Sequence, residues 1–257
     1  MSTRVNAEEL TTKVRDMYRH VAEKPDGGYH FELGRQLAVR LGYAVDILDR
    51  IPAGAVESFA GVGYFFDLAG LGEGEAVIDL GSGSGMDAFY AAQLVGPSGR
   101  VVGIDFTIEQ LDKARRLAAG AGLQWVEFRE GRIERPPADD HSADCVISNG
   151  VINLSPDKEG VFARAARLLR PGGRLAVADI VTERQLTDAI VADADLWASC
   201  IGGAAQEDAY HRAIEAAGLR PAQIRRNPYE FISAQARNAT RTYGVKSISL
   251  LAVKPSC

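Results

Sequence analysis

The spacing of the hydrophobic residues changes along the chain near residue 73. Before that point, apolar residues recur every three or four positions, as they do on the buried face of an amphipathic helix. This spacing predicts helices over residues 5–23, 29–41 and 45–48. We therefore expect a helical N-terminal cap over residues 1–60 and a main domain over residues 61–257.

Beyond residue 73, short apolar runs alternate with stretches of helical spacing. The runs predict seven strands, over residues 76–80, 101–105, 124–129, 143–148, 174–180, 223–226 and 247–253. Strands that alternate with helices form parallel sheets covered on both faces. The expected fold is therefore α/β, with a doubly wound, mostly parallel, seven-stranded Rossmann-like sheet. Thr107 and Gln110 predict a capping box at the start of one of its helices.

A glycine-rich loop follows the first predicted strand, in the sequence Asp79-Leu80-Gly81-Ser82-Gly83-Ser84-Gly85. Glycines between a strand and a helix let a ligand approach the backbone, and the helix N-terminus offers free N–H groups. The next strand ends in Asp105, whose carboxylate can accept the hydroxyls of a ribose. The loop and this acidic residue together indicate a site for a nucleoside-containing cofactor.

Two cofactor classes suit such a loop. A dinucleotide needs the pattern G-x-G-x-x-G/A, but the last position of that pattern is Met86 here. S-adenosylmethionine has no pyrophosphate and carries an ammonium group, so the negative charge of Asp79 beside the loop is favourable. This difference in charge favours the methyl donor.

The chain resembles the class I S-adenosylmethionine-dependent methyltransferases. The resemblance covers about residues 60 to 255 and rests on Val77–Gly85, Val102–Asp105 and Leu168–Leu175. It is closest to the arsenite methyltransferase branch at Ile147–Lys158 and Trp197–Ala204. It implies an antiparallel last strand and S-adenosylmethionine as the cofactor.

The resemblance also implies which residues contact the cofactor. It places the methionine part against Gly81, Ser82 and Gly83, the ribose on Asp105, and the adenine between Phe106 and Ile133. Ser148 and Asn149 are expected to face the methyl group. The candidate cofactor residues are therefore Asp79, Gly81, Ser82, Gly83, Asp105, Phe106, Arg132, Ile133, Ser148 and Asn149.

Members of the arsenite branch hold arsenic(III) between cysteine thiolates. Of the three cysteine positions, the first is Val62 in the Gly61–Gly63 turn, the second is Gly150, and only the third, Cys200, remains a cysteine. Arsenic(III) is soft and prefers several thiolates. The sequence therefore predicts transfer to an N, O or S atom of a small molecule. The alternatives are arsenite methylation with Cys200 and exogenous thiols, and a non-catalytic nucleoside-binding protein.

Five residues are candidates for contacts with the methyl acceptor. They are Tyr29, His30, Tyr64, Trp197 and Cys200. The run Tyr64-Phe65-Phe66 can floor an aromatic substrate pocket or belong to a helix that packs on the sheet, and Cys200 can be a ligand or a small apolar group.

Composition narrows the classes of partner. The formal net charge is −5 and the chain has no Lys/Arg tract, which disfavours nucleic acid as a partner. No apolar run approaches the roughly 18 residues of a membrane span. The three cysteines lack zinc-site spacing, and their odd number indicates free thiols in a reducing compartment. The start of the chain has no apolar signal segment, so we expect a cytoplasmic protein with no metal site and no membrane contact.

Overall fold

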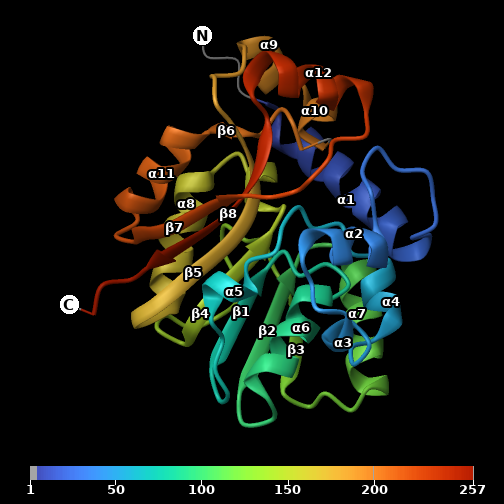
Figure 1. The fold of residues 1–257 in the computed structure, drawn as a ribbon, viewed down its shortest axis with the longest axis vertical. Helices are drawn as coiled ribbons and strands as arrows, with labels where there is room; N and C mark the ends of the chain where they lie inside the picture. The colour runs from blue at the N-terminus through green and yellow to red at the C-terminus, as the bar shows by residue number, and fades with distance from the viewer. Residues whose placement is uncertain (1–4, 199, 257) are drawn as a thin grey trace.

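The computed structural model describes residues 5–198 and 200–256, and within them an eight-stranded sheet forms the centre of the molecule (Figure 1). The strand order is β3-β2-β1-β4-β5-β8-β7, and β6 pairs with β5 beside that path. The strands are β1 (Ala76–Leu80), β2 (Arg100–Asp105), β3 (Val126–Glu130), β4 (Ala143–Asn149), β5 (Leu169–Thr182), β6 (Ala205–Gln206), β7 (Arg220–Arg226) and β8 (Lys246–Val253). The two-residue β6 is too short to be visible as a sequence pattern.

The pairing confirms the expected doubly wound, mostly parallel sheet. β1, β2, β3 and β4 pair in parallel, as do β4 and β5. β8 is antiparallel to both of its neighbours, β5 and β7. The strand order reverses direction at β1, so the carboxyl ends of β1 and β4 diverge there and leave room for a ligand.

Helices surround the sheet. They are α1 (Ala7–Glu23), α2 (Gly34–Leu41), α3 (Val45–Leu48), α4 (Ala53–Glu57), α5 (Phe66–Ala69), α6 (Met86–Val95), α7 (Ile108–Gly120), α8 (Lys158–Leu168), α9 (Asp188–Val191), α10 (Ala194–Ala198), α11 (Glu207–Ala216) and α12 (Ala234–Tyr243), with a 3₁₀ turn η1 (Ile152–Leu154). None of the described helices is long and apolar enough to cross a membrane.

The core has two parts because strand side chains alternate between the faces of the sheet. Val77 belongs to the apolar cluster shared with α6 and α7, while the next residue, Ile78, belongs to the cluster shared with α8 and α11. The N-terminal helices join the first cluster through Leu37 and Phe59. They therefore pack on the sheet, and the boundary at residue 60 stays a prediction.

Two local expectations were wrong. The helix expected over residues 29–41 begins only at Gly34, because the Tyr29 hydroxyl donates to the Lys24 carbonyl (2.8 Å) and its ring stacks on Phe31. α12 was not expected, since its sequence is polar and only Ala236 and Ala239 are buried.

Candidate active site

The glycine loop between β1 and α6 has a backbone that few other residues can adopt. Gly81, Gly83 and Gly85 have φ angles of +81°, +51° and +92°, in the left-handed region. A Cβ atom at Gly81 would lie 2.5 Å from Val151, whereas a Cβ atom at Gly83 would lie 3.6 Å from the Gln110 Oε1 atom. The loop therefore requires glycine for its conformation and leaves space beside Gly83.

Two buried polar atoms lie beside this loop without a hydrogen-bond partner in the described chain. They are Oδ2 of Asp79 and Oγ of Ser82, and both residues line the same cleft. Burial raises the pKa of Asp79 well above its usual range, and the nearby carboxylates of Asp87 and Asp105 raise it further. A cation bound here would supply the missing partner, so the site suits an ammonium group.

Asp105, at the carboxyl end of β2, ties the loop to the next strand. Its Oδ2 accepts the Gly83 N–H (2.9 Å) and its Oδ1 accepts the Thr107 N–H (2.8 Å). Burial raises the pKa of Asp105, and these hydrogen bonds oppose the rise. Each carboxylate oxygen retains a second lone pair, so Asp105 can also accept ribose hydroxyls.

The other end of the cleft has an aromatic wall. Phe106 follows Asp105, and the guanidinium groups of Arg15 and Arg132 lie 5.6 and 5.7 Å from its ring centroid. Ile133 also lines the cleft, and Glu134 accepts a hydrogen bond from the Ser155 hydroxyl (2.7 Å). An apolar surface with polar groups at its edge suits a planar base such as adenine.

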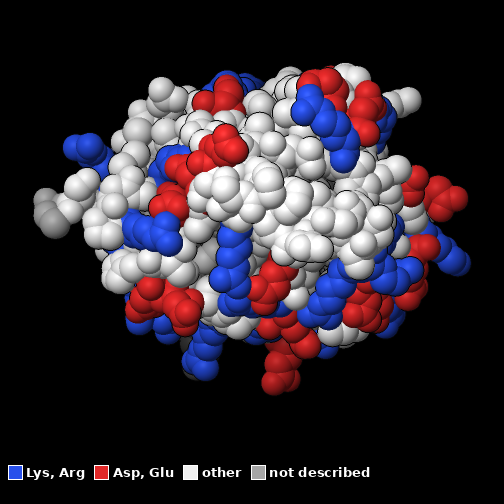
Figure 2. Space-filling view, turned by 90° about the horizontal axis from the view of Figure 1, so that it is seen from below, with Lys and Arg blue, Asp and Glu red and all other residues white. Residues whose placement is uncertain are grey.

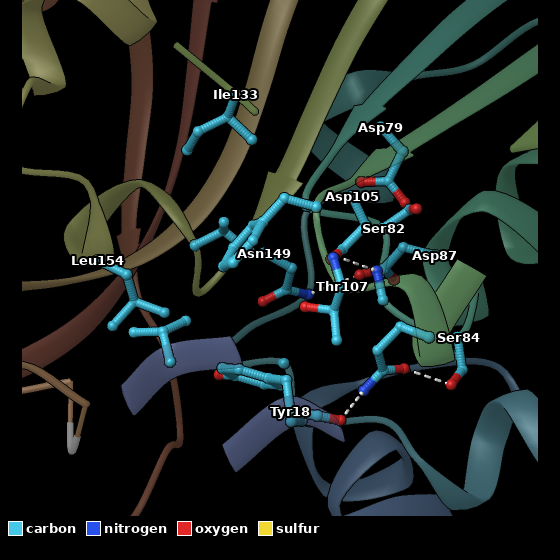
Figure 3. A pocket seen from close by; sticks show the side chains of 18 of the residues that line it. Tyr18, Asp79, Ser82, Ser84, Asp87, Asp105, Thr107, Ile133, Asn149 and Leu154 are labelled. Atoms are coloured by element: carbon cyan, nitrogen blue, oxygen red, sulfur yellow. Dashed lines mark hydrogen bonds between the residues drawn. The ribbon is translucent and has the colours of Figure 1, made fainter. Parts of the chain in front are cut away.

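Helix α1 covers the cleft. Leu10, Thr11, Val14 and Tyr18 of this helix line it, and Figure 3 shows the Tyr18 ring along the edge of the cavity opposite Asp79 and Asp105. Gln110 on α7 holds the helix, because its Nε2 donates to the Tyr18 carbonyl (2.7 Å) while its Oε1 accepts the Ser84 hydroxyl. The expected capping box is therefore absent, and Thr107 makes no side-chain cap.

The cleft between α1 and the sheet has about 1050 Å³ of space between protein atoms, part of it open to solvent. It is lined by nine of the ten predicted cofactor residues: Asp79, Gly81, Ser82, Gly83, Asp105, Phe106, Arg132, Ile133 and Asn149. Ser148 is not one of the lining residues, because its buried hydroxyl donates to the Leu80 carbonyl (2.7 Å) inside the sheet.

The five residues predicted for the acceptor do not line this cleft in the part of the chain that is described. Tyr64 packs edge-on against Tyr43, with ring centroids 5.0 Å apart. The His30 ring packs edge-on against Phe31, and Tyr29 stacks on the same ring. Trp197 is buried, and the Lys158 ammonium group lies 4.6 Å from the centroid of its ring. Contacts of these side chains with an acceptor stay predictions.

Cys200, the fifth of these residues, has a left-handed backbone (φ 61°), and its carbonyl accepts the Asn153 amide (3.3 Å). Burial raises the pKa of its thiol to about 12. A thiol with such a pKa is protonated at neutral pH and is a weaker ligand than a thiolate.

Sequence patterns did not reveal several residues of the site. Asp87 and Tyr43 form a buried hydrogen bond (2.5 Å) across 44 positions of the chain, and Tyr18 enters from the N-terminal helix. The one available signal was Asp87, an acidic residue in the first turn after a glycine loop. Tyr43 and Tyr18 looked like ordinary core residues, since the periodicity that predicts a helix does not show what its face contacts.

The fold and the cleft together define a class. The doubly wound sheet has its glycine loop and Asp105 at the topological switch point, beside Asp79 Oδ2 and Ser82 Oγ, which have no hydrogen-bond partner among the described residues. These are the features of a site for an adenosine-containing cofactor that carries a positive charge.

Comparisons with known proteins agree with this class. The methyltransferase domain family matches residues 71–218. The arsenite methyltransferase of Halobacterium salinarum is 41% identical over 196 residues, which cover 76% of this chain and 50% of that protein. The arsenite methyltransferase of Aquipseudomonas alcaligenes is 47% identical over 139 residues, covering 51% of this chain and 40% of that protein.

A solved structure gives the same result. An arsenic(III) S-adenosylmethionine methyltransferase from Chlamydomonas reinhardtii is 31% identical, with a TM-score of 0.65 over 86% of this chain and 74% of that one. The chain therefore belongs to the S-adenosylmethionine-dependent class I methyltransferases, on a branch related to arsenite methyltransferases. It spans about half the length, or less, of the curated relatives it matches.

Proposed function

We propose that this protein transfers the methyl group of S-adenosylmethionine to a nitrogen, oxygen or sulfur atom of a small molecule. The observation that carries the proposal is the pair of unpartnered buried atoms, Asp79 Oδ2 and Ser82 Oγ, in a cleft that also contains Asp105. S-adenosylmethionine supplies an electrophilic methyl group on a sulfonium centre. The chain's own residues bind and orient the two reactants and exclude water from them.

The cover provided by α1 supports a small acceptor. Tyr18 and Val14 close the cleft from the side opposite the sheet, so a macromolecular acceptor would have to displace the helix. Among the described residues, Arg132 is the one cationic side chain that lines the cleft, while Asp79, Asp87 and Asp105 are acidic. This charge distribution favours a neutral or cationic acceptor over a carboxylate or phosphate.

The surface supports the proposal that nucleic acid is not a partner, and the cysteines support a cytoplasmic location. Figure 2 shows acidic and basic side chains interspersed around one face of the molecule, with a broad uncharged area across its middle. A face of this kind offers no continuous basic track to a nucleic acid. Cys145 and Cys200 are free thiols, which fits a reducing compartment such as the cytoplasm.

Arsenite methylation is the second candidate, because both curated relatives described above carry that name. Two residues oppose it here. A Cβ atom at Gly150 would lie 3.3 Å from a methyl group of Val62, so the two altered thiol positions lie side by side and neither bears a sulfur. Cys200 alone remains, and its thiol is protonated at neutral pH.

A methyl-transfer assay tests both candidates. Purified protein is incubated with isotopically labelled S-adenosylmethionine and, in separate reactions, phenols, amines, thiols and arsenite, with products identified by mass spectrometry. We expect transfer to at least one organic acceptor and little or no methylarsenic. Fast arsenite methylation that is lost in Cys200→Ser would favour the second candidate. Absence of cofactor binding in a parallel calorimetric titration would remove both.

A further inference from the structure

Asp87 lies in the first turn of α6, just beyond the glycine loop, and is 7% exposed. Its Oδ1 accepts the Tyr43 hydroxyl (2.5 Å) and its Oδ2 accepts the Asn149 amide (3.0 Å). Burial raises the pKa of Asp87 to about 6, against the opposing effect of these two hydrogen bonds. At neutral pH the ionised carboxylate of Asp87 has both oxygens engaged by protein groups.

The contact with Asp87 and the backbone of the Gly61–Gly63 turn both determine which way the Asn149 amide points. A carboxylate oxygen only accepts hydrogen bonds, so the atom facing it must be the NH₂ group, and the amide oxygen must face the other way. That oxygen accepts the backbone N–H groups of Val62 (2.8 Å) and Gly63 (3.3 Å), while Nδ2 also lies 3.0 Å from the Gly63 carbonyl. One amide side chain thus holds the backbone of Val62 and Gly63.

The turn over Gly61–Gly63 begins at the wall of the cleft. Gly61 lines the cleft, and a Cβ atom there would lie 2.7 Å from Nδ2 of Asn149, so the backbone approaches that amide closely. The far side of the turn is held by the Ser247 hydroxyl, which donates to the Val62 carbonyl (2.6 Å). Val62 meets Gly150 at the end of β4, so the turn and the strand end meet where the resemblance expects the methyl group.

We propose that Asp87 is a positioning residue for methyl transfer. Its carboxylate orients Asn149, and Asn149 in turn holds the Gly61–Gly63 turn against the acceptor side of the cleft. Asp87 acts through these groups and does not itself contact the methyl group. The proposal rests on the proposed function for its catalytic consequence, but the hydrogen bonds that carry it exist without cofactor or acceptor.

The groups that face Asp87 are few. Tyr43, from the segment between α2 and α3, and Asn149, from β4, contact it directly, and the carboxylate of Asp79 on β1 is coupled to it electrostatically. Of these three groups, Asp79 is the other carboxylic acid, and burial raises its pKa well above the usual range. A fall in kcat at acid pH that the wild type shows at saturating cofactor, and that an Asp87 variant lacks, is therefore assigned to Asp87.

The decisive variant is Asp87→Asn, which keeps the shape but can donate as well as accept. The new amide loses the charge-assisted hydrogen bond to Asn149 and can present its own NH₂ group to Nδ2 of Asn149, which shifts the Asn149 side chain and the turn bound to it. We expect kcat for methyl transfer to fall by about tenfold or more, because a small misplacement of a reacting group lowers the rate strongly, while the dissociation constant of S-adenosylmethionine changes by less than about threefold. The matched control is Asp49→Asn, the same change at an exposed residue that pairs with Arg35.

The pH profile separates positioning from a merely structural role. In the wild type, kcat at saturating cofactor is expected to fall as the pH drops through about 6, where Asp87 takes up a proton and can donate to Asn149. In Asp87→Asn this limb of the profile is expected to be absent. A variant with wild-type kcat and an unchanged acid limb would overturn the proposal.

Hydrogen exchange gives a readout that needs no acceptor. The amides of Val62 and Gly63 are expected to be protected in the wild type at neutral pH and to exchange faster in Asp87→Asn, and also in the wild type at a pH below about 6, after correction for the intrinsic pH dependence of exchange. Unchanged protection in the variant would disprove the link between Asp87 and the turn. Failure to bind S-adenosylmethionine, measured separately, would instead disprove the proposed function and leave this link standing.

Discussion

At the scale of single residues, the site is dominated by carboxylates that are buried without compensating cations. Asp79 is 2% exposed and Asp105 and Asp87 lie near it, yet the hydrogen bonds of the site come from neutral donors. A buried charge without a counter-ion is unfavourable, and a cationic ligand removes the penalty. The cofactor and these residues therefore complement each other electrostatically.

Asp79→Asn is expected to weaken cofactor binding without lowering the stability of the fold. The unliganded variant should be as stable as the wild type or more so, because the change removes a buried unpaired charge. S-adenosylmethionine should bind about tenfold or more weakly, because its ammonium group loses a charged partner. Thermal melting with and without the cofactor measures both effects, and a variant with an undiminished cofactor-induced shift would contradict the assignment.

Asp105→Ala should weaken the binding of the cofactor more directly. Loss of charge-assisted hydrogen bonds to the ribose costs roughly 1.5–3 kcal/mol, or about ten- to a hundredfold in affinity. The substitution also frees the Gly83 N–H that Asp105 now holds. Calorimetric titration checks the value, with Asp112→Ala on the exposed face of α7 as the control. An unchanged dissociation constant would exclude Asp105 from the site.

Gly83→Val should abolish cofactor binding while the fold persists. The φ angle of +51° penalises a β-branched residue there, and the new side chain would enter the space that the expected methionine part occupies. Circular dichroism would show the retained fold and calorimetry the lost binding. Binding that survives in a natively folded variant would mean that the loop does not touch the ligand.

At the scale of elements, α1 and the sheet carry the site together. α1 meets α7 through Gln110, whose amide joins the Tyr18 carbonyl to the Ser84 hydroxyl of the glycine loop, and Lys113 adds a bond to the Ala22 carbonyl (3.1 Å). Ser58 also donates to the Val21 carbonyl (3.3 Å), and Lys13 of α1 pairs with Asp195, so α1 is joined to several neighbouring elements by polar contacts.

Gln110→Leu is expected to loosen this helix. The substitution retains much of the volume but leaves the Tyr18 carbonyl and the Ser84 hydroxyl without that partner. S-adenosylhomocysteine should dissociate several-fold faster, and trypsin should cut α1 more readily. Stopped-flow displacement and limited proteolysis test these effects against Gln124→Leu, at an exposed position. Equal rates in both variants would show that Gln110 does not retain the helix.

At the scale of the whole molecule, the balance of carboxylates predicts how stability changes with pH. The pKa values of Asp79, Asp87 and Asp105 are raised by burial, so the folded state binds protons more readily than the unfolded state at these positions. Their effect is to increase stability as the pH falls through their folded pKa values. Glu127 has the opposite shift, to about 2, chiefly because Arg129 donates to it, so its contribution is lost in strong acid.

The unliganded protein should therefore unfold at a higher temperature at about pH 6 than at about pH 7.5. With saturating S-adenosylmethionine the difference should shrink or reverse, because the cofactor's cationic groups favour the ionised carboxylates. Calorimetric scans at both pH values test this expectation. A melting temperature that rises with pH in the absence of cofactor would contradict the assignment of raised pKa values.

The sequence by itself determined the sheet and much of the cofactor site. Strands were predicted over four to seven residues each, and every strand except β6 was among them; for the buried strands this is because burial leaves a local apolar pattern. The glycine loop and Asp105 were recognisable for the same reason, since the residues that shape a turn at a strand end lie next to one another in the chain.

The tertiary structure alone decided what closes the site. Tyr43 reaches Asp87 across 44 positions, Asn149 reaches Val62 across 87, and Gln110 reaches Tyr18 across 92. Gln110, which was expected to cap its own helix, instead binds the covering helix α1, and Ser148 lies inside the sheet. Such contacts leave no periodic trace, because they depend on how the helices pack on the sheet and not on the spacing of residues within any one element.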